Sequence, residues 1–157
     1  MVWKLASPSG HAALRRGRFS SAGQIYHVTV VTHGRTPVFK QYDVAVAAAR
    51  CLHRQSDLNG SRLLAWVLMP DHTHWLLQLG QLESLSHAVA RLKSATARCA
   101  NRARGQEGPL CSRSFHDHAL RRDEDVQKVA RYLIANPLRA GLVERIGDYP
   151  FWDAVWL

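Results

Sequence analysis

The stretch RLLAWVLMPDHTHWLLQL, residues 62–79, decides the fold. Residues 62–69 are almost entirely apolar and rich in strand-forming side chains, and residues 73–79 form a second run of this kind. Pro70 and Asp71, which separate the two runs, are turn-forming residues. The stretch therefore predicts two neighbouring antiparallel strands joined by a tight turn.

Residue patterns on both sides of this hairpin predict two further strands and three helices. The predicted strands cover residues 24–32 and 114–121, and the predicted helices cover residues 41–57, 84–104 and 124–135. We expect Asp123 to cap the last helix, and Asn136 to follow its end because a residue before proline avoids helical geometry. The order β-α-β-β-α-β-α is that of split β-α-β units. It predicts an α+β ferredoxin-like sandwich with one antiparallel sheet and helices mainly on one face.

The length of 157 residues predicts one domain with a buried core. We assign residues 1–157 to this domain, with a basic arm over residues 1–23 and a C-terminal tail over residues 145–157. The sequence contains no run of about 18 apolar residues and no continuous hydrophobic leader, so we predict neither a membrane span nor a signal peptide. The cysteines, Cys51, Cys99 and Cys111, lack metal-binding spacing, and we expect reduced thiols in a cytoplasmic protein.

Positive charge is the strongest functional signal in the composition. The formal net charge is +9, and residues 1–40 contain six lysines and arginines but no acidic residue. This excess favours an anionic partner, with nucleic acid as the leading candidate and a merely basic protein as the alternative. We expect no membrane partner, because no basic amphipathic helix with a bulky aromatic face is present. The arginines expected to contact DNA are Arg15, Arg16 and Arg18 in the arm and Arg91, Arg98 and Arg102 on the helix 84–104, where each can equally be a solubilising group.

His72 and His74 lie at positions i and i+2 of a predicted strand, so their side chains point to the same face while Thr73 points to the other. Two adjacent imidazoles bind a divalent cation well, but two ligands do not complete a site. The alternative is one surface histidine and one hydrogen-bonded core histidine. His116 and His118 form a second pair with this spacing, and their role stays open between metal binding and DNA contact.

The helix that follows carries Lys128, Tyr132 and Asn136 at spacings of four, which places them on one face. A tyrosine in such a position is a candidate nucleophile, but it can equally be an amphipathic residue whose hydroxyl is wet. Lys128, one turn before it, is a candidate support for a phenolate or a phosphate, or else a solvated lysine. These residues offer the further polar groups that a site built on the histidine pair would need.

The segment VLMPDHTHWLLQL, residues 67–79, resembles the HUH motif of single-tyrosine transposases, and RYLIANPLRAGLV, residues 131–143, resembles their nucleophile helix. The specific resemblance is to REP-associated tyrosine transposases and spans nearly the whole chain. GQIYHVTVVTHGRTPVF, residues 23–39, resembles their first strand and loop. SFHDHALR, residues 114–121, and DYPFWDAVWL, residues 148–157, resemble later segments. One departure is Thr73, because the central HUH residue is usually a large hydrophobe.

The resemblance implies a role for each of these positions. His72 and His74 would bind a divalent metal, Mg²⁺ or Mn²⁺, together with Asn136, and Tyr132 would be the nucleophile. The implied activity is cleavage and rejoining of single-stranded DNA through a 5′-phosphotyrosine, with REP-like hairpins as substrates. A bacterial cytoplasmic, nucleoid-associated enzyme is implied, either a monomer or a homodimer.

Other functions are also compatible with the sequence. A domesticated DNA-hairpin-binding protein would share the fold without catalysis, and an HUH replication initiator would share the chemistry. A relaxase is disfavoured, because its tyrosine precedes the histidines, whereas Tyr132 follows His74. An RNA-binding ferredoxin-like module would need exposed aromatic residues on its central strands, but Tyr26 and Trp66 lie in strands with core-like patterns.

Overall fold

The structure is a computed structural model that describes residues 20–156. Its strands are β1 (Ile25–Val31), β2 (Asp57–Leu58), β3 (Ser61–Leu68), β4 (His72–Gln78), β5 (His116–Ala119) and β6 (Trp152–Ala154). Its helices are α1 (Tyr42–Arg54), α2 (Leu85–Arg104), α3 (Val126–Ile134) and the short α4 (Asn136–Arg139), with 3₁₀ turns at His33–Arg35, Val38–Lys40 and Ile146–Asp148. Each helix and strand predicted from the sequence is present, with its ends shifted by a few residues.

The β3–β4 hairpin lies at the centre of the sheet, as predicted. The strand order is β2-β3-β4-β1-β5, β6 pairs with β3, and all pairings are antiparallel. At the turn, Leu68 and Thr73 are Cα partners, and the Met69 N–H donates to the His72 carbonyl at 2.8 Å. The predicted antiparallel α+β architecture is confirmed.

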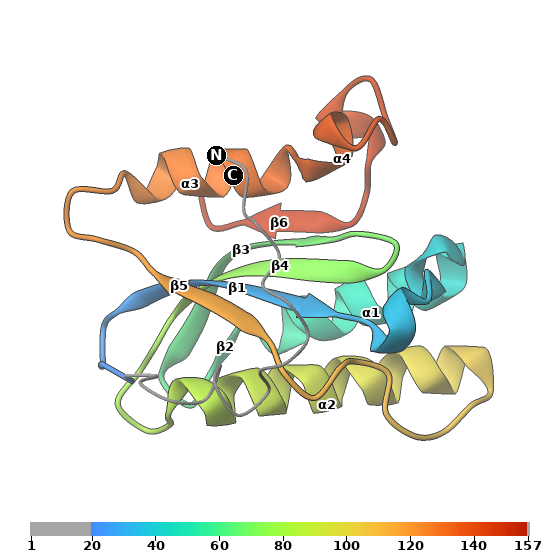
Figure 1. Cartoon of the computed structure of the whole chain (residues 1–157), viewed down its shortest axis with the longest axis horizontal. Coiled ribbons are helices and arrows are strands. Elements are labelled where there is room, and N and C mark those ends of the chain that lie inside the picture. Colours follow the sequence, from blue (N-terminus) through green and yellow to red (C-terminus); the bar gives the residue numbers. More distant parts are fainter. Residues whose placement is uncertain (1–19, 157) are drawn as a thin grey trace.

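Helices cover both faces of the sheet. Figure 1 shows α1 and α2 below the sheet and α3 above it, with β6 between α3 and the rest of the strands. Thr73, Trp75 and Leu77 of β4 point toward α1 and α2, where Trp75 and Leu77 join the larger core. The opposite face packs Leu76 against Leu133 of α3. The two long helices share a face, as the sequence predicts, and α3 is placed over the face to which the histidines point.

The boundaries of α3 differ from the prediction at its start. Asp125, not Asp123, is the capping residue, since its carboxylate accepts hydrogen bonds from the N–H groups of Gln127 and Lys128 at 3.0 and 3.2 Å. Ala135 separates α3 from α4, and Pro137 then lies in the first turn of α4, where a missing N–H costs nothing. This junction lies three residues after Tyr132.

The predicted C-terminal tail contributes to the sheet. Trp152–Ala154 form β6 and pair with Val67, Trp66 and Ala65 of β3. The hydroxyl of Tyr149 donates to the Leu68 carbonyl at 2.6 Å, which fixes the segment before β6 to the end of β3. The tail is therefore structural, at least up to Ala154.

Two predictions from composition bear on the fold. Across the described residues, no helix has the length and apolar character that spanning a membrane would require. Cys51, Cys99 and Cys111 are all free, and Cys51, on α1, is buried.

Candidate functional site

His72 and His74 project from β4 to the face of the sheet that α3 covers in part. Their ring centroids are 4.9 Å apart and the rings meet edge to face. Thr73, between them, is 3% exposed and donates a hydrogen bond to the Val67 carbonyl at 2.9 Å on the opposite side. The predicted separation of the two histidines from Thr73 is confirmed, and a small polar residue is tolerated in the centre because its hydroxyl has an acceptor.

Asp71 orients the His72 ring. The Nδ1 atom of His72 lies 2.6 Å from Oδ1 of Asp71, and Arg35 approaches the other carboxylate oxygen at 3.3 Å. Burial alone would raise the pKa of Asp71, but its hydrogen bonds and ion pairs with His72 and Arg35 outweigh burial and hold the pKa below its usual value. An ionised carboxylate accepts only, so Nδ1 of His72 donates to Oδ1 of Asp71, and Nε2 is left outside this contact.

Two residues of β1 hold the His74 ring in a similar way. Thr29 is the Cα partner of His74, and its Oγ1 lies 3.0 Å from Nδ1, while Nε2 of His27 lies 3.2 Å from the same nitrogen. Burial, together with His72, His27 and Arg139, holds the pKa of His74 well below its usual value. Burial and the neighbouring His118 lower the pKa of His27 to about 4. Both rings are therefore neutral at pH 7.

His27 and Thr29 do not emerge from the sequence analysis, although a signal was present. Strand β1 alternates, with Tyr26, Val28 and Val30 buried. The intervening His27 and Thr29 therefore share the face that His72 and His74 occupy once β1 is placed beside β4. The pairing of β1 with β4 is a long-range contact that the local pattern does not give.

Tyr132 lies at the C-terminal end of α3 with 49% of its surface exposed. The guanidinium carbon of Arg139 stands 3.7 Å from the centroid of its ring. Leu133, the residue after Tyr132, packs in the same core cluster as Leu76 of β4, so the end of α3 lies on the face of the sheet that carries the histidine pair. Lys128 is exposed one turn before Tyr132, and Arg139, which the sequence analysis did not single out, is the cation in contact with the tyrosine ring.

Asn136 begins α4 directly after the junction. Its Nδ2 donates to the Leu133 carbonyl at 2.7 Å, so the last turn of α3 fixes the amide and Oδ1 is left as a potential ligand. Among residues 20–156, no three or more His, Cys, Asp or Glu side chains gather as a metal site would require. A metal bound by His72 and His74 would therefore take an amide, phosphate or water oxygen as its next ligand, which suits Mg²⁺ or Mn²⁺.

The second histidine pair lies on β5, across β1 from the first. His118 is the Cα partner of His27, and its Nε2 is 3.1 Å from Oε1 of Glu124. His116 is the Cα partner of Thr29 and its side chain is exposed. His118 thus links β5 to the segment that leads into α3, and His116 stands at the rim of the face that carries His72 and His74.

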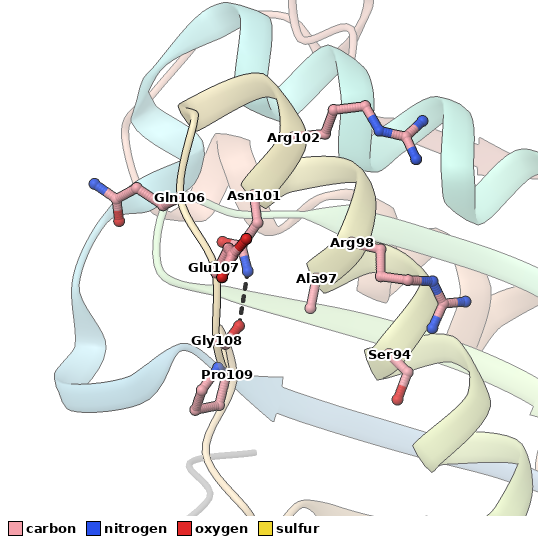
Figure 2. A pocket seen from close by; sticks show the side chains of 9 residues that line it. All are labelled: Ser94, Ala97, Arg98, Asn101, Arg102, Gln106, Glu107, Gly108 and Pro109. Atoms are coloured by element: carbon pink, nitrogen blue, oxygen red, sulfur yellow. Dashed lines mark hydrogen bonds between the residues drawn. The ribbon is translucent and has the colours of Figure 1, made fainter.

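The arginines expected to contact DNA separate into three groups. Arg91 is held in an ion pair, because Glu83 binds its guanidinium at 2.9 Å, and the Arg91 side chain is only 17% exposed. Arg98 and Arg102 line an open groove of about 530 Å³ between α2 and the loop 106–109, and Figure 2 shows their guanidinium groups extending in the same direction. Arg15, Arg16 and Arg18 lie outside the described residues.

Comparisons with known proteins place this geometry in a family. Residues 20–133 match the model of the IS200-like transposases. The chain belongs to this family. The matched residues of this family member include His72, His74 and Tyr132, whereas Asn136 and Arg139 lie beyond them.

Individual relatives agree with this assignment. A Haemophilus influenzae protein assigned to the REP-associated tyrosine transposases is 28% identical over 141 residues, which cover 82% of this chain and 78% of the relative. The REP-associated tyrosine transposase of Escherichia coli K12 is 30% identical over 89 residues, which cover 55% of this chain and 50% of the relative. A solved structure of a REP-associated tyrosine transposase bound to a REP hairpin shares the fold, with a TM-score of 0.64, 24% identity, and coverage of 86% and 79% of the two chains.

Proposed function

We propose that the protein is a metal-dependent single-strand DNA endonuclease and strand transferase that acts on REP-like hairpins through a 5′-phosphotyrosine. The observation that carries this proposal is the orientation of the two histidines. Asp71 and Thr29 each contact a Nδ1 atom, at 2.6 and 3.0 Å, so both Nε2 atoms stay free to bind a cation. The carboxylate–histidine contact at His72 is typical of second-shell support for a metal ligand.

His72, His74 and the Asn136 amide would hold Mg²⁺ or Mn²⁺. When bound, such a cation neutralises charge on the phosphate and fixes its orientation. The low pKa of His74 supports this role, because the imidazole is neutral and its lone pair is available at pH 7. In this arrangement, Nδ1 of His74 carries the ring proton and donates it to the hydroxyl oxygen of Thr29.

Tyr132 is the proposed nucleophile. Its ring is half exposed at the end of α3, so a strand can reach the hydroxyl without rearrangement of the core. In the cleavage step, a bond forms between Tyr132 Oη and phosphorus, and the bond to the 3′ oxygen breaks with its electron pair on that oxygen. The phenol proton passes to solvent, and the released 3′ oxygen takes up a proton. Attack by another 3′-hydroxyl reverses the step and frees the tyrosine, so rejoining needs no ATP. Lys128, one turn before Tyr132, would support the phosphate.

The DNA surface proposed for the hairpin stem includes the groove beside α2. Arg98 and Arg102 both line it, and Asn101 closes one side through a hydrogen bond from Nδ2 to the Gly108 carbonyl at 2.7 Å. Guanidinium groups bind phosphate oxygens well and carry no sequence information. Arg98 and Arg102 are the cations among the residues that line the groove, and Glu107 is an anion there, so the attraction for phosphate depends on the two arginines.

The proposal is tested by mixing the full chain with Mn²⁺ and labelled single-stranded hairpin DNA, followed by a denaturing gel. A covalent adduct is expected for the wild type and is expected to disappear in Tyr132→Phe. His72→Ala and His74→Ala should each abolish cleavage while the chain stays folded. Adduct formation by Tyr132→Phe would exclude this tyrosine, and equal cleavage of duplex DNA would exclude the single-strand substrate.

The second candidate is a DNA-hairpin-binding protein without catalysis. If this candidate is correct, the wild type would bind the hairpin tightly and form no adduct in Mg²⁺ or Mn²⁺. The arrangement of Tyr132, whose ring is exposed beside a cation, favours the enzyme, because binding alone needs no nucleophile at that position.

A further inference from the structure

We propose that Arg139 binds the phosphate that Tyr132 attacks. This inference rests on the proposed function and assigns a further catalytic residue to it. The sequence gives no reason to select Arg139 among the many basic residues, but its position in the structure does, because it contacts Tyr132.

Arg139 is in direct contact with the proposed nucleophile. Its guanidinium carbon is 3.7 Å from the centroid of the Tyr132 ring, and both side chains are exposed. In one continuous helix, residues seven apart lie about 10 Å from each other along the axis. Arg139 lies beyond the break at Ala135, in the single turn of α4, and its long side chain reaches back over the tyrosine ring.

Arg139 and Tyr132 stand at the end of α3 on the face of the sheet that carries His72 and His74, because Leu133 of α3 packs in the same core cluster as Leu76 of β4.

The guanidinium has hydrogen-bonding capacity to spare. Arg35, Arg91 and Arg145 are each paired with a carboxylate, whereas within residues 20–156 no carboxylate lies within ion-pair distance of Arg139. A guanidinium whose face rests on an aromatic ring keeps its N–H groups in the plane, where they point away from that ring. This fork matches the two non-bridging oxygens of a phosphodiester.

In the step proposed for Tyr132, Arg139 would neutralise charge on the non-bridging oxygens while the bond from Tyr132 Oη to phosphorus forms and the bond to the 3′ oxygen breaks. Arg139 gains and loses no proton, because its charge is permanent at any pH near neutrality. The stack on the tyrosine ring keeps the guanidinium beside the nucleophile before DNA arrives.

The test compares Arg139→Gln and Arg139→Lys in the full chain with Mn²⁺ and labelled hairpin oligonucleotides taken from palindromic DNA beside the gene. Adduct formation should slow by about 100-fold or more in Arg139→Gln, the usual effect of removing a charge-stabilising donor. Arg139→Lys should recover part of that rate because it restores the charge. The matched control is Arg131→Gln, which removes an exposed arginine whose guanidinium contacts Gln127 on the same helix. It should form adduct at the wild-type rate.

A second readout does not depend on cleavage. In a Tyr132→Phe background, the slope of log affinity against log salt for the hairpin should fall by about 0.7 when Arg139 becomes Gln, the value for one phosphate contact on a single strand. Arg131→Gln should leave the slope unchanged.

The outcomes separate the two proposals. If the wild type forms the adduct and Arg139→Gln changes neither its rate nor the salt slope, the role of Arg139 is overturned and the proposed function stands. If the wild type forms no adduct, the proposed function fails. The salt slope alone then decides whether Arg139 contacts a phosphate.

Discussion

Thr29 of β1 faces His74 of β4 directly across the sheet, with its hydroxyl oxygen 3.0 Å from Nδ1 of the imidazole. If His74 is a metal ligand, this hydroxyl orients it. We therefore expect Thr29→Val to lower Mn²⁺ affinity about 10- to 100-fold, the usual cost of losing an outer contact to a ligand. Thr29→Ser, which keeps the hydroxyl, should bind Mn²⁺ nearly as the wild type does. Calorimetric titration with Mn²⁺ measures both, and equal affinity in Thr29→Val would contradict the positioning role of Thr29.

Glu83 and Arg91 form an ion pair in which their side chains are 6% and 17% exposed. Burial alone would raise the pKa of Glu83, but the hydrogen bonds and charge of Arg91, with help from Ser61 and Asn59, hold it below the usual 4.5. The folded pKa is thus lower than the unfolded one, so this stabilisation is complete above the unfolded value and declines as the pH falls through the folded value. Glu83→Gln should lose about 1–3 kcal/mol at pH 7 and show a shallower loss of stability below pH 4.5.

Urea denaturation at pH 7 and at acidic pH measures this difference. Because Arg91 also donates to the Gln55 side chain, the second variant Gln55→Ala serves as a control that keeps the ion pair. Its acid dependence should match that of the wild type. An identical acid profile for Glu83→Gln and the wild type would remove Glu83 from the groups that destabilise the protein in acid.

Gly80 allows the end of β4 to approach the β2–β3 turn. A Cβ at this position would overlap the backbone of Gly60 and Ser61, which cannot rotate away as a flexible side chain can. We expect Gly80→Ala to destabilise the fold by about 1–3 kcal/mol or more, the usual cost of overpacking. Gly147→Ala is the matched control, because nothing would lie within 4 Å of a Cβ added at that position. Thermal unfolding of the two variants should differ clearly.

The sequence predicts most of the fold because the relevant signals are local. Strand β1 alternates over Ile25–Val31, and the hairpin around Pro70 and Asp71 is bounded by apolar runs. Strand β6 is missed, since Trp152–Ala154 is too short to show a period and pairs with β3 more than 80 positions earlier in the chain. The capping residue is misplaced by two because Asp123, Glu124 and Asp125 are all acidic and only the backbone decides which carboxylate reaches the first free N–H groups.

The candidate site was predictable only in part, for a related reason. His72, His74, Tyr132 and Asn136 belong to short motifs that a reader can recognise in the sequence. Thr29 and His27 enter the site only through the pairing of β1 with β4, and Arg139 enters it through its contact with the Tyr132 ring, which the sequence pattern does not give. Arg91 illustrates the opposite error, because its place on the helix border predicts a solvent-facing cation while Glu83, eight residues earlier, binds it.

Asn136 combines two properties that substitution can separate. Its Nδ2 donates to the Leu133 carbonyl at 2.7 Å, which supports the end of α3, and its Oδ1 is the proposed metal ligand. Asn136→Ala loses both, whereas the serine hydroxyl in Asn136→Ser can still donate to a carbonyl one turn earlier but offers no second arm. We expect both variants to bind Mn²⁺ at least about tenfold more weakly. Only Asn136→Ala should lose about 1 kcal/mol of unfolding free energy, because it loses the hydrogen bond, and it should therefore unfold at a lower temperature. Wild-type Mn²⁺ affinity in Asn136→Ser would mean that Asn136 serves the helix end alone, and the third ligand would then have to come from the DNA or from water.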